Sequence, residues 1–252
     1  MFKTIGVLVL SALMAACQRG PAAEQLEIRS HLLQAGFPEN DIQLYDGDVY
    51  VGRDAHVTLE ASRELRLDAL NPDCGRQSNL VDESVTRICV NPSASFNAYS
   101  RLSQGLDAAI DNYNELGLRI TFARGPTTGC TANISADTLS GTEGSAGFPS
   151  GGRPYAAIKI GVGLQNHGVD ENERVITHAL GHTLGLRHMD YLDRTISCGS
   201  GGNVGVRTKG VILIPGAPST ETVGSSVMDS CFRSTGTGVW TRIDRTMMDY
   251  LY

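Results

Sequence analysis

Residues 177–188 read THALGHTLGLRH, and the first two histidines of this segment, His178 and His182, lie four residues apart. On an α-helix such residues project from the same face, one turn above the other, so both imidazoles can reach one metal ion. Gly185 can adopt a positive φ that other residues resist, which ends the helix and turns the chain. His188 then supplies a third nitrogen, and the segment predicts a metal site with three imidazole ligands.

The predicted ligand set indicates a catalytic rather than a structural site. Three neutral imidazoles leave the fourth tetrahedral position open to water, as catalytic zinc sites do. Nitrogen ligands also suit copper, nickel and iron, so the spacing alone does not choose the metal. The remaining histidines, His31, His56 and His167, have no such companions, and we expect surface or packing roles for them.

A methionine further along the chain strengthens the metal-site interpretation. Met228 lies in the segment SSVMDS, residues 225–230. This segment resembles the Met-turn, which lies beneath the zinc ion in metzincin proteases. Astacins and serralysins carry an additional tyrosine ligand two residues after that methionine, and Ser230 stands at this position here. The resemblance therefore implies no metal ligand from the Met-turn.

Five segments resemble the bacterial dual-action HEIGH metallopeptidases, family M57, and together they cover most of residues 24–252. The histidine and Met-turn motifs are specific, and the other segments are supportive. The five segments are Ala35-Gly36-Phe37 with Asp41-Ile42, Ala146-Gly147-Phe148-Pro149 with Pro154-Tyr155, the histidine helix through Asp190, Ile214-Pro215-Gly216-Ala217-Pro218, and Asp244 to Tyr252.

This resemblance implies a fold, a metal and a class of substrate. The implied fold is α+β: a metzincin-like zincin domain with a twisted mixed sheet, an active-site helix and a loop-rich lower lobe that contains the Met-turn. The implied metal is zinc, bound by His178, His182 and His188. The implied substrate is a protein or peptide that lies extended along the edge strand of the upper lobe.

Ala179 departs from the family pattern, because zincins carry glutamate directly after the first histidine. That glutamate takes a proton from the attacking water and passes one to the leaving amine, which a methyl group cannot do. General acid–base groups contribute about 10²- to 10⁴-fold to the rate, so we expect a site that binds metal and peptide but turns over poorly. An engineered substitution, a natural loss of activity and recruitment of another base all stay open as explanations.

No strong substitute for the missing base is visible in the sequence. Asp190 follows His188 by two residues, and we interpret it as a carboxylate that steadies the loop around the ligands. Three functions follow as hypotheses. The first is a zinc metalloendopeptidase domain impaired by Ala179, the second an inactive zinc-binding module that grips peptides or surface polymers, and the third a structural envelope lipoprotein without metal.

The first residues are typical of an exported lipoprotein. Lys3 precedes an uncharged run, residues 5–16, that is too short to span a bilayer. The segment LMAAC, residues 13–17, resembles the bacterial lipobox, which implies cleavage before Cys17 and lipidation of its thiol. Gln18 is not the aspartate that retains such lipoproteins at the inner membrane. We therefore expect an outer-membrane lipoprotein that faces the periplasm or the cell exterior.

The cysteine pattern fits an oxidising compartment. Five cysteines follow Cys17, so at least one is left unpaired: Cys74, Cys89, Cys130, Cys198 and Cys231. Cys198 and Cys231 both fall in the predicted lower lobe, and we expect a disulfide between them. Cys74 is a less favoured candidate for a latency ligand to the zinc, and a disulfide or a buried thiol is preferred for it.

The chain divides into a leader, a short tether and two folded parts. We predict a signal peptide over residues 1–16, a tether over residues 17–23, a small α+β segment and candidate pro-region over residues 24–75, and the metallopeptidase domain over residues 76–252. Helices are predicted from Glu24 to Gly36, Ser100 to Glu115, Glu171 to Leu184 and Arg242 to Tyr252; a hairpin about Asp46-Gly47; strands at residues 118–122 and 158–162; and a glycine-rich loop over residues 141–154.

Composition excludes one class of partner. The net charge is -6 and the basic residues are scattered, so the chain lacks the basic surface that nucleic-acid binding requires. We expect no nucleic-acid partner, a membrane association through Cys17 alone, and a monomer.

Overall fold

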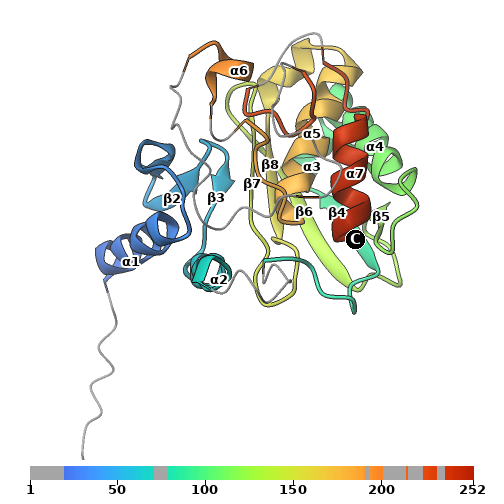
Figure 1. Ribbon diagram of the computed structural model, residues 1–252. Helices are drawn as coiled ribbons and strands as arrows, with labels where there is room; N and C mark the ends of the chain where they lie inside the picture. The colour runs from blue at the N-terminus through green and yellow to red at the C-terminus, as the bar shows by residue number, and fades with distance from the viewer. Residues whose placement is uncertain (1–19, 71–78, 191–192, 201–213, 215–223, 232–235) are drawn as a thin grey trace, which may run out of the picture.

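A computed structural model describes residues 20–70, 79–190, 193–200, 214, 224–231 and 236–252 of the chain. In these ranges one eight-stranded sheet has the order β1-β2-β3-β7-β8-β6-β4-β5 (Figure 1). Its strands are β1 (Ile42–Tyr45), β2 (Asp48–Val51), β3 (Ala55–His56), β4 (Arg87–Pro92), β5 (Thr121–Arg124), β6 (Ala132–Leu139), β7 (Gly144–Gly147) and β8 (Ala157–Gly161).

The strand directions are mixed. β5, β4, β6 and β8 run parallel to one another, and β7 is antiparallel to β8. On its other edge β7 pairs with β3 in parallel, with Ala55 opposite Ala146 and His56 opposite Gly147. The β1-β2-β3 meander therefore extends the sheet beyond β7, the strand that would otherwise form its edge.

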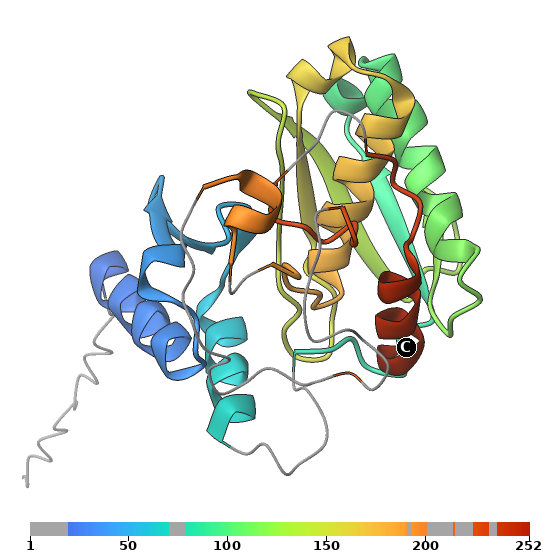
Figure 2. The ribbon, with the colours of Figure 1, turned by 45° about the horizontal axis from the view of Figure 1, so that its top comes forward.

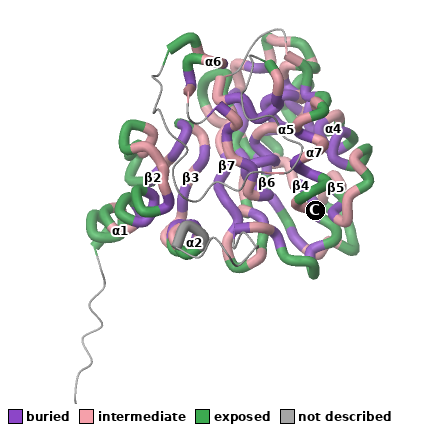
Figure 3. Tube along the Cα trace, viewed as in Figure 1, coloured by how far each residue is buried: buried purple, intermediate pink, exposed green. Residues whose placement is uncertain are grey.

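Two long helices cover the parallel part of the sheet. α4 (Ser100–Asn114) and α5 (Val169–Thr183) lie side by side, with α7 (Arg242–Leu251) beside them (Figures 1 and 2). α4 forms because its apolar residues repeat at helical spacing and bury one face. The buried residues follow the central strands and α5 (Figure 3), and they include Leu102, Leu106, Ile134, Ile158, Ile160, Ile176 and Leu180.

Residues 20–70, which we call the N-terminal unit, have a second apolar core. The unit comprises α1 (Pro21–Gln34), the three strands of the meander and α2 (Leu59–Leu70). Its core holds Ile28, Leu32, Val49, Val51, Val57, Ala61 and Leu65, and Phe148 joins it from the segment after β7. Two short helices, α3 (Ala94–Asn97) and α6 (Thr195–Cys198), and two 3₁₀ helices, Glu39–Asp41 and Val162–Asn166, complete the described elements.

The predicted fold class is confirmed, and so are the four predicted helices and the hairpin, within a few residues at their ends. The predicted tether is wrong for residues 21–23, because Pro21 occupies the first turn of α1, where proline is favoured. Residues 1–19 and the predicted boundary at residues 71–75 lie outside the described ranges. Within those ranges, none of the helices is both long and apolar enough to cross a membrane.

The glycine-rich loop predicted over residues 141–154 is wrong, because it contains β7. The glycines serve close packing here. A Cβ on Gly144 would lie 2.8 Å from the Val175 side chain, and one on Gly147 would lie 2.8 Å from the His56 carbonyl. The other two strand predictions are shifted, since β5 begins at Thr121 and Val162 lies in a 3₁₀ helix.

Candidate metal centre

α5 and the turn after it bring the three predicted histidines together. His178 and His182 lie one turn apart on α5, and Gly185 follows the helix with φ of 99°. The Leu186 amide donates to the Gly181 carbonyl over 3.0 Å, which closes the helix end. A Cβ at Gly185 would lie 2.5 Å from the Asn79 carbonyl, so glycine is required there for conformation and for space.

The three imidazole rings face one another. Their centroids lie 4.7 Å apart for His178 and His182, 4.9 Å for His182 and His188, and 5.1 Å for His178 and His188. The Nε2 atoms of His178 and His188 are 3.2 Å apart. The three rings therefore converge on one point, as the spacing predicts.

Backbone carbonyls fix the orientation of two of the rings. His178 Nδ1 lies 2.8 Å from the Val227 carbonyl, and His182 Nδ1 lies 2.8 Å from the Leu186 carbonyl. A carbonyl can only accept, so each Nδ1 donates and each Nε2 presents its lone pair to the centre.

Met228 lies directly beneath α5. It is fully buried, and a Cβ on Gly181 would meet its Sδ at 2.7 Å. Asp244 of α7 braces this turn, because its carboxylate accepts from the Val227 amide over 3.0 Å and from the Ser226 hydroxyl. The Met-turn thus supports the helix that carries two ligands and supplies the carbonyl that orients His178.

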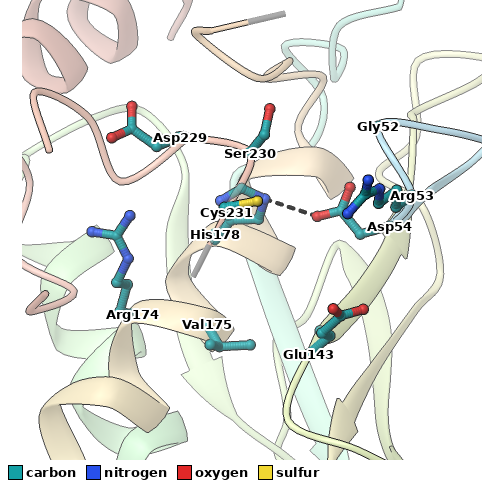
Figure 4. A pocket seen from close by; sticks show the side chains of 11 residues that line it. Gly52, Arg53, Asp54, Glu143, Arg174, Val175, His178, Asp229, Ser230 and Cys231 are labelled. Carbon is teal, nitrogen blue, oxygen red and sulfur yellow. Dashed lines mark hydrogen bonds and ion pairs between the residues drawn. The ribbon is translucent and has the colours of Figure 1, made fainter. Parts of the chain in front are cut away.

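A fourth residue, which the histidine motif does not predict, completes the cluster. Asp54 Oδ2 lies 3.0 Å from His178 Nε2 (Figure 4). The same oxygen lies 3.4 Å from His182 Nε2, and Asp54 Oδ1 lies 3.2 Å from His188 Nε2. Asp54 precedes β3 in the N-terminal unit, 124 residues before His178. The helical spacing of the histidines cannot predict a contact with a residue so far away in the sequence.

The cluster fits zinc. Its ligand atoms all lie within 4.8 Å of one another. His182 Nε2 and Asp54 Oδ1 are buried with no hydrogen-bond partner, which is costly unless a cation satisfies them. Three imidazole nitrogens and one carboxylate oxygen match the tetrahedral N and O ligands of zinc.

The surroundings of the cluster favour a neutral His178 imidazole and an ionised Asp54 carboxylate. Burial lowers the pKa of His178 to about 4, which keeps its ring neutral near pH 7. Burial opposes ionisation of Asp54, but the His188 and His182 charges and the His178 hydrogen bond outweigh it and hold the pKa of that carboxyl well below its usual value. For His188, burial acts to lower the pKa, and Asp54 outweighs it and raises the pKa.

A cavity opens beside the cluster, next to the Met-turn (Figure 4). Arg53, Glu143, Arg174 and Val175 line it together with His178, and residues 229–231 form its other wall. Ala179 follows His178 on α5 and is buried, so the position of the family glutamate carries a methyl group within the packed core.

The structure places the remaining predicted residues in supporting positions. The buried Asp190 carboxylate accepts from the Ser230 amide over 2.9 Å and from the Ser197 hydroxyl over 2.5 Å, so it ties together the two segments that flank the site. Cys198 and Cys231 are bonded, with an S–S distance of 2.07 Å, which is the pair that the sequence favours. A second disulfide, which the sequence did not assign, joins Cys89 to Cys130.

Two of the histidines outside the motif pack away from the cluster, and two of the cysteines lie outside the described ranges. His31 bonds the Ser62 hydroxyl at 3.0 Å and His56 bonds Tyr155 at 2.8 Å, so both have packing roles. Cys17 and Cys74 lie outside the described residues.

Replacing Asp229 by asparagine is expected to stabilise the fold above pH 6. Burial raises the pKa of Asp229 from 3.8 to about 6, so the folded chain holds a proton that the unfolded chain releases between these values. Stability therefore falls as pH rises from about 4 to 6, and asparagine, which does not ionise, avoids this loss. Melting temperatures of the two chains at pH 4 and pH 8 measure it. An equal difference at both pH values would contradict the assignment.

Comparison with known proteins identifies the family. A family model described as dual-action HEIGH metallo-peptidase matches residues 49–252. Two similar solved structures are high choriolytic enzyme 1, a hatching enzyme zinc-protease from the medaka fish Oryzias latipes (18% identity, TM-score 0.44, covering 69% of this chain and 94% of that chain), and myroilysin (13% identity, TM-score 0.43, covering 69% and 86%). A search of curated proteins gave no match. Since the family model spans well over half of the sequence, the chain belongs to the dual-action HEIGH metallopeptidase family.

Proposed function

We propose that this chain is a zinc-dependent metalloendopeptidase domain that acts on extracytoplasmic proteins or peptides, with turnover impaired by Ala179. The observation that carries the proposal is the convergence of three imidazoles on one point, with the Nδ1 atoms of His178 and His182 held by carbonyls. Membership of a zinc metallopeptidase family supports peptide-bond hydrolysis as the reaction.

Different parts of the site serve substrate binding, activation of the carbonyl and proton transfer in the proposed reaction. A zinc ion held by His178, His182 and His188 would supply Lewis-acid chemistry at the centre. An extended peptide would pair with the edge of β7 that β3 occupies in this structure, and the cavity beside His178 would receive a side chain next to the scissile bond. Ala179 offers no atom that can accept or donate a proton, so the proton-transfer step lacks its group.

The test restores the missing group. Ala179→Glu is expected to cleave casein in a manner that a chelator abolishes, whereas the unaltered chain cleaves it slowly or not at all. Elemental analysis of both chains accompanies the assay. A restored chain that holds one zinc per chain yet cuts no unfolded protein would overturn the endopeptidase proposal.

One observation favours a second candidate, an inactive zinc-bearing module that binds peptides or surface polymers. Asp54 stands in the fourth position that a catalytic site keeps open, and closed four-ligand sites are typical of structural zinc. Peptide binding without cleavage by the zinc-loaded Ala179→Glu chain would favour this candidate over the first.

We propose that the chain is exported and anchored to the outer membrane by a lipid on Cys17, and that it is a monomer. The lipobox-like segment at residues 13–17 supports the anchor, and the two disulfides support an oxidising compartment. Cys17→Ser is expected to abolish incorporation of radiolabelled palmitate during expression in a bacterial host and to move the chain to the soluble fraction. Equal labelling of the two chains would contradict the anchor.

A further inference from the structure

We propose that the N-terminal unit is an autoinhibitory module, in which Asp54 occupies the metal's open position and β3 occupies the strand edge that a substrate needs. The inference rests on the proposed function, because it assigns a state to the same site. Three independent features carry it: the approach of Asp54 to the ligands, the pairing of β3 with β7, and the attachment of the unit to the lower lobe.

The approach of Asp54 requires a glycine beside it. Gly52 has φ of 66°, and a Cβ there would lie 2.5 Å from Cε1 and Nδ1 of His188. No side chain fits this gap, so the backbone of the unit lies directly on a ligand ring. Arg53 follows with φ of 80°, a left-handed conformation that is unfavourable for a residue with a side chain. Gly52 and Arg53 together turn the chain so that the Asp54 carboxylate faces all three Nε2 atoms.

β3 pairs with the strand edge that a substrate peptide would need, the edge of β7. The Ala146 amide donates to the Asp54 carbonyl over 3.0 Å, and the Phe148 amide donates to the His56 carbonyl over 3.4 Å. The Ser145 hydroxyl donates to the Asp54 carbonyl over 3.1 Å. These contacts occupy the edge of β7 that does not pair with β8. An extended peptide that pairs with β7 needs the same backbone groups, so peptide and β3 exclude each other.

Arg194 contacts the N-terminal unit at two places. Arg194 lies just before α6 and is buried, with its guanidinium 2.6 Å from Asp41 Oδ1 and 3.1 Å from the Gly52 carbonyl. The first contact is a charge-assisted bond to the 3₁₀ helix of the unit, and the second reaches the residue that lies on His188. Arg194 thus connects the two segments of the unit that approach the site.

The N-terminal unit can be displaced without opening the main core. Its apolar residues form their own cluster, separate from the cluster beneath α4 and α5, and Phe148 is the main-domain member of the smaller cluster among the described residues. A unit with its own core is able to move as a body, which a loop of the main core is not.

The experiment measures access to the centre in the full, zinc-loaded chain. The probe is the hydroxamate of a short leucine-rich peptide, which ligates zinc and pairs with β7. Titration calorimetry compares the unaltered chain with Asp54→Asn, whose amide is a poor zinc ligand of the same size. If the unaltered site is open about 1% of the time, the variant binds the probe about 100-fold more tightly.

Two further variants separate this effect from a loss of folding. Asp46→Asn, in the hairpin turn, is the matched control and is expected to bind the probe as the unaltered chain does. Asp41→Asn removes the negative charge that faces Arg194 without touching a ligand, and an intermediate gain is expected. Melting curves confirm that each variant folds.

The outcomes distinguish this inference from the proposed function. Equal probe affinity in zinc-loaded unaltered, Asp54→Asn and Asp41→Asn chains would overturn autoinhibition and leave the zinc site intact. A folded, unaltered chain that takes up no zinc would overturn the metal site itself, and autoinhibition with it.

Discussion

The double variant Ala179→Glu, Asp54→Asn is expected to cleave casein at least about 100-fold faster than the unaltered chain, because a general acid–base group contributes about 10²- to 10⁴-fold. Glutamate at residue 179 supplies the proton acceptor beside His178. Asparagine at residue 54 removes the carboxylate from the fourth position and frees the centre for water and a peptide carbonyl. The initial rate, measured with and without a chelator, gives the result.

The single variants show how the two changes combine. Ala179→Glu alone is expected to be slower than the double variant, since Asp54 still faces the three imidazoles. Asp54→Asn alone stays slow because the base is missing. Ala179→Gln with Asp54→Asn is the matched control, as glutamine has the size of glutamate without its basicity. Cleavage by this control at the rate of the glutamate variant would contradict the proposed role of residue 179.

His182→Ala is expected to reduce the zinc content from one ion per chain to a trace after dialysis. His182 is the most buried of the three ligands, at 1% exposure, and its ring is held by the Leu186 carbonyl. Loss of an outer partner of a metal ligand typically weakens binding by about 10- to 100-fold, and loss of the ligand itself exceeds that. Elemental analysis and titration against a chromogenic chelator measure the change.

His167→Ala is the matched control for this prediction, since His167 lies before α5 and outside the cluster. It is expected to retain full zinc content. If His182→Ala folds and also retains one zinc per chain after dialysis, the histidine cluster is not the zinc site.

The histidine helix was predictable because its information is local. A spacing of four residues and a glycine after the helix determine which way His178, His182 and His188 project, and the structure brings their rings together. Of the two carbonyls that orient the rings, only one could be predicted from the local sequence. Leu186 lies within the motif, whereas Val227 reaches His178 through the fold of the Met-turn.

Asp54 and β7 could not be predicted from the sequence, and the physical reason is the same for both. Each is defined by its neighbours in space: Asp54 by ligands more than a hundred residues away, and β7 by pairing with β8 and β3. A strand rich in glycine has no alternating apolar pattern, and an aspartate in a turn has the composition of any surface turn. The structure places β3 along the edge of β7 that the β8 pairing leaves open.

The most direct test of the metal centre is a crystal structure of the zinc-loaded full chain, with anomalous data collected at the zinc absorption edge. We expect one strong peak, about 2.0–2.2 Å from Nε2 of His178, His182 and His188 and from one oxygen of Asp54. A peak at any other group of residues, or no peak in a chain soaked with excess zinc, would contradict the assignment of these three histidines as the zinc ligands.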